Sequence, residues 1–128
     1  MKIKIQVKSD FIDGGFHEYP AIYNDYDGSL KIVWKERIED DDEESIFELT
    51  YDKDNREVVL VRKGGIRSKL VFCEGKVTEG VISSKYGSFP LEIETKSISM
   101  PNKVVSNIKI EYNVVGADSN VFEALLVF

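Results

Sequence analysis

The chain has 128 residues, of which 42% are hydrophobic and 11% aromatic, and its formal net charge is −6. This length is typical of one domain with its own core, so we expect a single domain over residues 1–128. The negative charge disfavours nucleic acid and anionic membranes as partners, and no apolar run approaches the roughly 20 residues of a membrane-spanning helix.

Cys73 is the single cysteine, which excludes an internal disulfide. The start MKIKIQVKSDF lacks the apolar segment and the small-residue cleavage site of a secretory signal. We therefore expect a cytoplasmic protein in which Cys73 behaves as a small apolar residue.

Hydrophobic residues alternate with polar ones along most of the chain, which is the period-two pattern of half-buried strands. In chain order, the positions predicted to face inward are Ile3, Ile5 and Val7; Leu30, Ile32 and Trp34; Phe47, Leu49 and Tyr51; Phe89, Leu91, Ile93 and Thr95; and Val104, Ser106, Ile108, Ile110, Tyr112 and Val114. Turn sequences separate these runs, at residues 13–15, 25–29, 52–55, 63–65, 74–76 and 115–120.

Strands that follow one another through tight turns are typical of an antiparallel meander, here of about eight to ten strands. An open sheet of that size leaves two exposed edges, whereas pairing the first strand with residues 120–128 closes it. A two-layer sandwich is the alternative, with its long crossovers at residues 9–20 or near residue 40. We predict an all-β fold in which the chain forms a single closed antiparallel meander barrel.

Four segments in the second half of the chain carry a family resemblance. They are VVLVRKGG at 58–65, Ser68 with the LVF that ends at Phe72, SKYGSFPLEIET at 84–95 and IKIEY at 108–112. In this order and spacing they resemble the YwiB-like β-barrel proteins of Gram-positive bacteria, a family of unknown function. The resemblance implies a lipocalin-like, or calycin-like, barrel and no particular activity. Ser84 and Lys85 depart from the Thr-Pro that the family commonly has there, and the acidic tract at 39–44 looks like a local addition.

Arg62 shares the predicted inward face of its strand with Val58 and Leu60, which places a guanidinium inside the barrel near one end. A buried guanidinium needs hydrogen-bond partners. In one interpretation it holds the carboxylate or phosphate of a small amphipathic ligand; in the other it is a structural latch that stacks on an aromatic ring and bonds carbonyls. The candidate ligand-binding residues are Arg62, Ser68, Tyr86, Thr95 and Tyr112, with Ser84 as a further hydroxyl and with Leu70, Phe72, Phe89 and Ile93 against the apolar part of the ligand.

Two clusters of charged residues each have a functional interpretation and a simpler one as solvated surface. The cations Lys63, Arg67, Lys69 and Lys85 either steer an anionic ligand or belong to a solvated hairpin. The acidic run at 39–45, with Asp25 and Asp27, has the oxygen-rich composition of calcium-binding loops. It lacks the twelve-residue pattern of such a loop, so a mobile solvated loop is predicted. We expect no metal site and no cofactor.

Catalysis has little support in the sequence. His17 is the single histidine, and Glu92 and Glu94 share a predicted outward, solvated face. No hydrolase elbow, zinc motif or phosphate loop is found, so we expect a protein that is not an enzyme. Two hypotheses remain: a barrel that binds a small apolar or anionic-headed molecule, or a ligand-free barrel that acts through its surface, for example as a homodimer joined through Val59, Val61 and Val71.

Overall fold

The chain folds into a closed antiparallel barrel. In the computed structural model, the residues described are 1–8, 15–37, 44–102, 106–117 and 119–128. They form the strands β1 (Lys2–Lys8), β2 (His17–Tyr26), β3 (Ser29–Arg37), β4 (Glu44–Asp52), β5 (Glu57–Lys63), β6 (Arg67–Cys73), β7 (Val77–Ser84), β8 (Gly87–Ser99), β9 (Asn107–Val114) and β10 (Ser119–Val127). Each strand pairs with its neighbours in sequence, and β1 pairs with β10. The predicted all-β fold and the predicted closure are confirmed.

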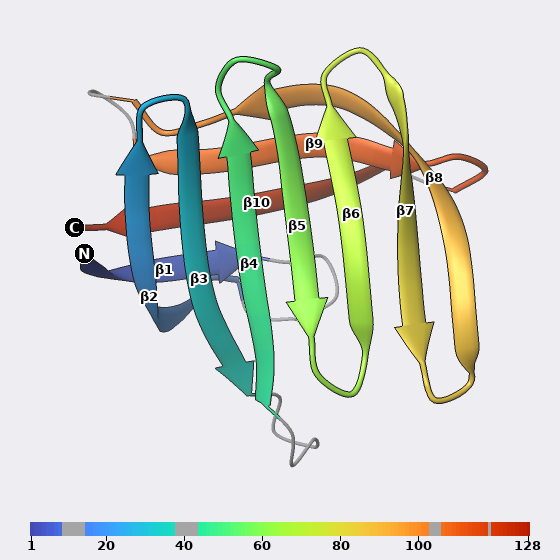
Figure 1. Ribbon diagram of the computed structural model, residues 1–128, viewed down its shortest axis with the longest axis horizontal. Coiled ribbons are helices and arrows are strands. Elements are labelled where there is room, and N and C mark those ends of the chain that lie inside the picture. The colour runs from blue at the N-terminus through green and yellow to red at the C-terminus, as the bar shows by residue number, and fades with distance from the viewer. Residues whose placement is uncertain (9–14, 38–43, 103–105, 118) are drawn as a thin grey trace.

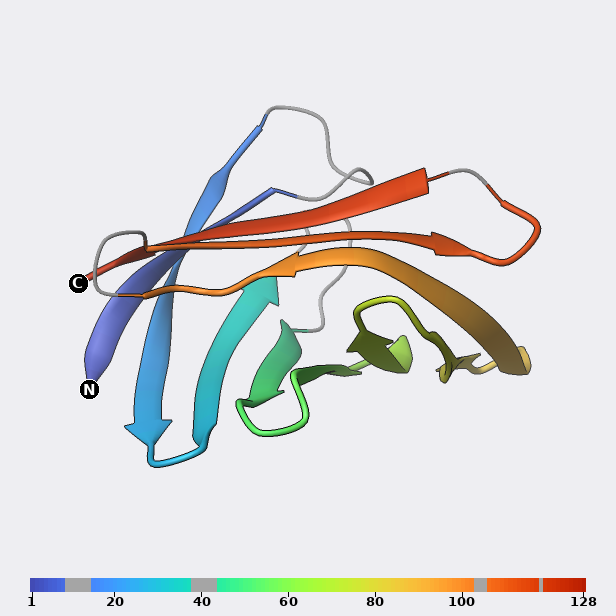
Figure 2. The same cartoon turned by 90° about the horizontal axis from the view of Figure 1, so that it is seen from above.

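The barrel is flattened into two layers that cross. Strands β2 to β7 run side by side in one layer, and β1, β9 and β10 cross behind them (Figures 1 and 2). The long strand β8 curves from the first layer into the second. Its register shifts between Thr95 and Ser97, and such a β-bulge bends a strand and lets it turn a corner.

Tight turns join β2 to β3, β4 to β5, β5 to β6 and β6 to β7 at the predicted places. Between β2 and β3, Gly28 has a φ of +91°, a left-handed conformation that glycine adopts without steric cost. Between β4 and β5, a carboxylate oxygen of Asp52 accepts the backbone N–H groups of Asp54 and Asn55 at 3.0 and 3.2 Å. These local bonds hold the meander in register. The predicted turn at 13–15 falls largely outside the described residues.

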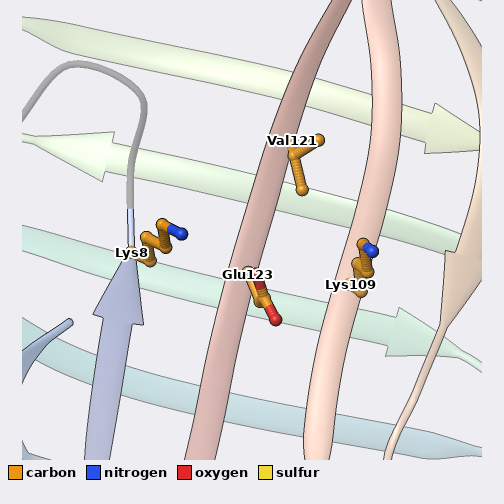
Figure 3. Close-up of a pocket in the computed structure, with 4 residues that line it drawn as sticks. All are labelled: Lys8, Lys109, Val121 and Glu123. Atoms are coloured by element: carbon orange, nitrogen blue, oxygen red, sulfur yellow. The ribbon is translucent and has the colours of Figure 1, made fainter. Parts of the chain in front are cut away.

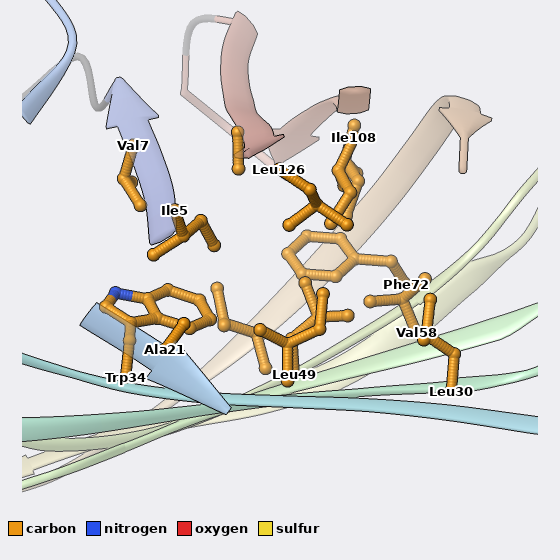
Figure 4. Packing of buried hydrophobic residues seen from close by; sticks show 14 of the residues in the cluster. Ile5, Val7, Ala21, Leu30, Trp34, Leu49, Val58, Phe72, Ile108 and Leu126 are labelled. Atoms are coloured by element: carbon orange, nitrogen blue, oxygen red, sulfur yellow. The ribbon is translucent and has the colours of Figure 1, made fainter. Parts of the chain in front are cut away.

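The core lies between the two layers and follows the predicted alternation (Figure 4). Its fully buried apolar side chains are Trp34, Phe72, Ile5, Ile32, Leu49, Ile93, Ile108, Ile110 and Val58. Half-buried side chains at predicted inward positions are Phe47, Tyr51, Leu91, Ser106, Tyr112 and Val114. Val104 lies outside the described residues.

The structure corrects the prediction for Phe89, whose place in the alternation predicts a core position. Phe89 has the inward parity of Leu91 and Ile93, but its side chain is 58% exposed. At this end of β8 the strand continues past the crossing layer, as do the neighbouring ends of β5, β6 and β7 (Figure 1). No described strand lies opposite Phe89 to bury it, so its side chain faces inward onto an open end.

Two smaller expectations concern the cysteine and the membrane. Cys73 is a free, buried cysteine, in keeping with the predicted apolar role. Within the described ranges, no helix is long and apolar enough to cross a membrane.

Candidate functional site

One row of inward-facing neighbours crosses seven strands at the open end of the barrel. We call it the mouth row, and it consists of Ala21, Trp34, Phe47, Arg62, Ser68, Ile82 and Phe89, each paired with the next across a ladder. Burial decreases along it: Ala21 and Trp34 are buried, the central members are half-buried, and Phe89 is exposed. The row therefore runs from a packed side of the barrel to an open one.

Arg62 lies at the middle of this row and ends an aromatic stack. Its guanidinium carbon is 5.5 Å from the centre of the Phe47 ring. The Phe47 ring in turn stacks on Trp34, with the ring centres 5.4 Å apart and an angle of 8° between the planes. Because the three residues are successive cross-strand neighbours, the sheet itself sets this stacking.

Arg62 bonds a hydroxyl that the sequence did not predict as its partner. Its Nε and Nη2 groups donate to Oγ of Ser45 at 3.3 and 3.2 Å. A guanidinium carries five N–H donors, so this single oxygen leaves part of its capacity unused. Among the described carboxylates, none lies within ion-pairing distance of Arg62. The guanidinium is thus oriented by Phe47 and Ser45.

The structure corrects the prediction that Ser45 lies in a solvated acidic loop. The residue belongs to β4, is buried and pairs with Glu36 of β3. Its place in the strand alternation outweighs the acidic composition of the preceding segment. Residues 39–43 of that segment lie outside the described residues.

Glu36 adds a buried carboxylate beside the stack. It is only 8% exposed, and one of its oxygens accepts the indole N–H of Trp34 at 3.1 Å. Burial raises the pKa of Glu36, and the Trp34 hydrogen bond and the positive charges of Arg62 and His17 partly offset that rise. This end of the barrel therefore combines a carboxylate that is costly to ionise with a guanidinium.

Tyr19 and His17 of β2 border the same carboxylate. Burial raises the pKa of the Tyr19 hydroxyl, and the nearby charge of Glu36 raises it further. The Nε2 atom of His17 is buried and finds no hydrogen-bond partner among the described residues. His17 pairs with Val7, an inward-facing residue, so its ring is turned toward the interior rather than to solvent.

The structure brings together only part of the predicted ligand-binding set. Ser68 is the cross-strand neighbour of Arg62 and shares its face. Tyr86 lies in the β7–β8 turn and is 81% exposed, so it does not cover the open end. Its backbone N–H donates to Oγ of Ser84 at 3.1 Å, which commits that hydroxyl to the turn.

Thr95 and Tyr112 lie at the opposite end of the barrel from Arg62. They pair with each other across β8 and β9. Thr95 is six residues beyond Phe89, which corresponds to about 20 Å at the rise of a strand. Thr95 is fully buried, and Tyr112 packs edge-on against Phe72 with the ring centres 4.8 Å apart. Both residues therefore belong to the packed part of the barrel.

A hollow of about 210 Å³ lies on the outside of the second layer, where Figure 3 shows its lining residues. It is lined by Lys8, Lys109, Val121 and Glu123. Glu123 pairs with Lys8 on one side and with Lys109 on the other, so the carboxylate faces a cation on each neighbouring strand. This local balance of charge makes the hollow a weaker candidate than the open end.

Asp25, one of the acidic residues weighed for calcium in the sequence, has other partners. Asp25 forms an ion pair with Lys53 at 2.6 Å and accepts the hydroxyl of Tyr23 at 3.3 Å. Within the described ranges, no group of three or more His, Cys, Asp and Glu residues is arranged to hold a metal.

Sequence reasoning missed Glu36, Ser45 and Tyr19 as members of the site. A signal for Glu36 was present, because it continues the inward parity of Ile32 and Trp34. The signal for Ser45 was similar, since Phe47 and Leu49 share its parity. Neither residue stands out as part of a site in the sequence, because charged and acidic stretches usually mark solvated surface.

Comparisons with known proteins support the fold and the family. A family model described as a domain of unknown function, DUF1934, matches residues 17–123. Among solved structures, the crystal structure of the ywiB protein from Bacillus subtilis is similar, with 17% identity over 98% of this chain and 87% of that chain and a TM-score of 0.70. A search of curated proteins finds no match. The predicted resemblance to YwiB-like barrels is confirmed.

Proposed function

This chain belongs to the DUF1934 family, and we propose that the open end of its barrel binds a small amphipathic molecule with an anionic head group. In this proposal Arg62 and Ser68 bond the head group, while the half-buried inner face of β6, β7 and β8 holds the apolar part. The family description assigns no activity, so the proposal rests on the geometry of the mouth row alone.

One observation carries the proposal: the mouth row places an incompletely bonded guanidinium beside an uncovered apolar surface. Arg62 bonds only Ser45 among the described residues, and a guanidinium matches the two oxygens of a carboxylate or phosphate. Further along the row, beyond Ser68, Ile82 of β7 is half-buried and Phe89 of β8 is exposed. A molecule with both kinds of group complements this arrangement better than a purely polar or a purely apolar one.

The apolar part of the proposed site extends one row deeper. There Leu70, Gly80 and Leu91 are cross-strand neighbours, and all three are half-buried. Covering such side chains is favourable by about 25 cal/mol per Å² of apolar surface. The lack of a side chain at Gly80 leaves Leu70 and Leu91 to form the floor of this surface.

The packed centre of the barrel limits where a ligand can lie. Trp34, Phe72 and Leu49 fill the space between the layers (Figure 4). This filling favours the alternative of a ligand-free barrel for the deep interior, so we place the ligand at the open end only. We propose binding without catalysis, because among the described residues Ser45 is bonded by Arg62 and by no histidine.

Trp34 provides the reporter for a test, since it is the single tryptophan and lies in the Arg62 stack. Decanoate and decanol serve as probes with the same chain length and different head groups. We expect decanoate to change the fluorescence of Trp34 and to bind about tenfold or more tightly than decanol, because hydrogen bonds to charged groups contribute about 1.5–3 kcal/mol.

The variant Arg62→Met should abolish this preference for decanoate and change the free energy of unfolding by less than about 1 kcal/mol. Arg56→Met is the matched control, because it removes the same charge from the β4–β5 turn and should leave binding unchanged. Equal affinities for the two probes, or an Arg62→Met variant that retains the preference, would contradict the proposal. Gross unfolding of Arg62→Met would instead identify Arg62 as a structural latch. Native mass spectrometry of protein from its own host would identify a natural ligand by its mass.

A further inference from the structure

The outer face of β5 to β8 carries opposite charges at its two ends. From this pattern we infer that the face docks on the same face of a second copy of the chain, forming a symmetric dimer. The inference concerns the outward-pointing residues of these strands and does not rest on ligand binding, although the hollow at the basic end adjoins the proposed ligand site and shares Arg62 and Ser68 with it.

The basic end of the face comprises Lys63, Arg67 and Lys69. They line a hollow of about 310 Å³ together with Val61, Val81 and Ser83, and two members of the mouth row, Arg62 and Ser68, line it as well. Lys63 has a carboxylate partner, Glu48, at 3.8 Å. Within the described part of the chain, Arg67 and Lys69 have no carboxylate within ion-pairing distance. A chain with a net charge of −6 thus gathers positive charge around one shallow hollow.

The acidic end comprises Glu79, Glu92 and Glu94. Glu79 and Glu92 are directly opposite each other in the β7–β8 ladder, and Glu94 is opposite Val77. All three glutamates are exposed, and no described cation pairs with them. Like charges directly opposite each other destabilise a sheet, so this pair is unfavourable in an isolated barrel.

Valines lie between the two charged ends. Val59 pairs with Val71, and Lys69 pairs with both Val61 and Val81. The first three valines are half-buried and Val81 is exposed. They include the residues that the sequence suggested for a homodimer, and they form an apolar centre flanked by charge, as protein interfaces commonly do.

A two-fold axis lying in the interface, across the valines, makes this face self-complementary. It places the basic end of each copy on the acidic end of the other and packs valines on valines. A glutamate from the partner can then enter the hollow between Arg67 and Lys69. An anionic small molecule or a nucleic acid would use only the basic end, whereas a second copy also accounts for the opposed glutamates and the valines.

The test uses two charge-reversed proteins and the unmodified chain. Arg67→Glu/Lys69→Glu makes the whole face acidic, and Glu79→Lys/Glu92→Lys makes it basic. Sedimentation over a series of protein concentrations should give a dimer for the unmodified chain, weakened by salt. Each variant alone should raise the dimer dissociation constant about tenfold or more, and an equimolar mixture of the two should form a heterodimer.

Lys8→Glu/Lys109→Glu is the matched control for Arg67→Glu/Lys69→Glu, because it makes the same change in net charge on the opposite wall (Figure 3). It should dimerise like the unmodified chain, and circular dichroism should show that all variants are folded. A monomer at every concentration, variants that dimerise as well as the unmodified chain, or a mixture that stays monomeric would each overturn the inference.

Discussion

Phe72 and Phe89 point to the same inner face of the first layer but have opposite surroundings. Phe72 is fully buried and packs edge-on against Tyr112 of β9. Phe89 is 58% exposed, because no described strand crosses opposite its end of β8. The alternation along a strand determines which way a side chain points, whereas the position of the opposing layer determines whether it is buried.

The packed region and the open end therefore have different roles in the molecule. In the packed region, Ile108 and Leu126 of the second layer cover the first layer from behind (Figure 4). This packing stabilises the barrel and leaves Ile82 and Phe89, at the open end, outside the core cluster. The open end is thus free to carry Arg62 in a half-buried position that a packed core would exclude.

The largest effect should come from truncating the two phenylalanines separately. Phe72→Ala should lower the free energy of unfolding by about 3–5 kcal/mol, because it leaves a cavity in the packed region. Phe89→Ala should change it by about 0.5 kcal/mol or less, as is usual for exposed positions. Urea denaturation measures both values. Similar losses in the two variants would mean that Phe89 is covered in solution, and the comparison would fail.

Gly80 lies where the packed region meets the open end, and Gly80→Ala should have an intermediate effect. The added Cβ would lie 3.0 Å from Cδ1 of Ile93, 3.1 Å from Cδ2 of Leu70 and 3.1 Å from the carbonyl oxygen of Lys69. Such overpacking costs about 1–3 kcal/mol.

Leu70→Val removes one of these contacts, so it provides the check on Gly80→Ala. The double variant should lose less stability than the sum of the two single variants, as measured by thermal unfolding. Additive losses would show that Leu70 does not limit the space at Gly80.

Glu36→Gln should have the smallest effect, which develops as the pH rises through a defined window. Burial raises the pKa of Glu36 above its usual value of 4.5, so the folded state holds the proton more tightly than the unfolded state. Its contribution to stability is therefore present below pH 4.5 and is lost as the pH rises through the raised pKa.

The glutamine variant should match the unmodified chain below this window and unfold at a higher temperature above it. Thermal unfolding at a series of pH values measures the difference, and Glu74→Gln, at an exposed turn glutamate, is the control. A glutamine variant that is less stable at neutral pH would show that the ionised Glu36 is stabilising, contrary to the raised pKa.

The sequence predicted which face of its strand a residue lies on, but not which end of the barrel it lies at. Parity placed Arg62, Thr95 and Tyr112 inside, as the structure has them, but it could not separate the two ends of the barrel, because separation depends on ladder register. Closure was predictable because a meander of this size has two edges to cover. The exposure of Phe89 was not predictable, since it depends on where β1, β9 and β10 cross the first layer.

The pairing of β1 with β10 restricts how this protein meets other molecules. Each strand of the barrel has a hydrogen-bonded neighbour on both sides, so the described strands leave no edge that runs along the whole sheet. Residues 87–91 of β8 pair with β7 but with no described residue of β9, because the β8–β9 ladder begins at Ile93. Strand addition, the mode by which many sheet proteins capture extended segments, is therefore restricted to such short stretches while the barrel is intact. Over the rest of the barrel recognition has to come from side chains, and specificity can change by substitution without disturbing the ladders.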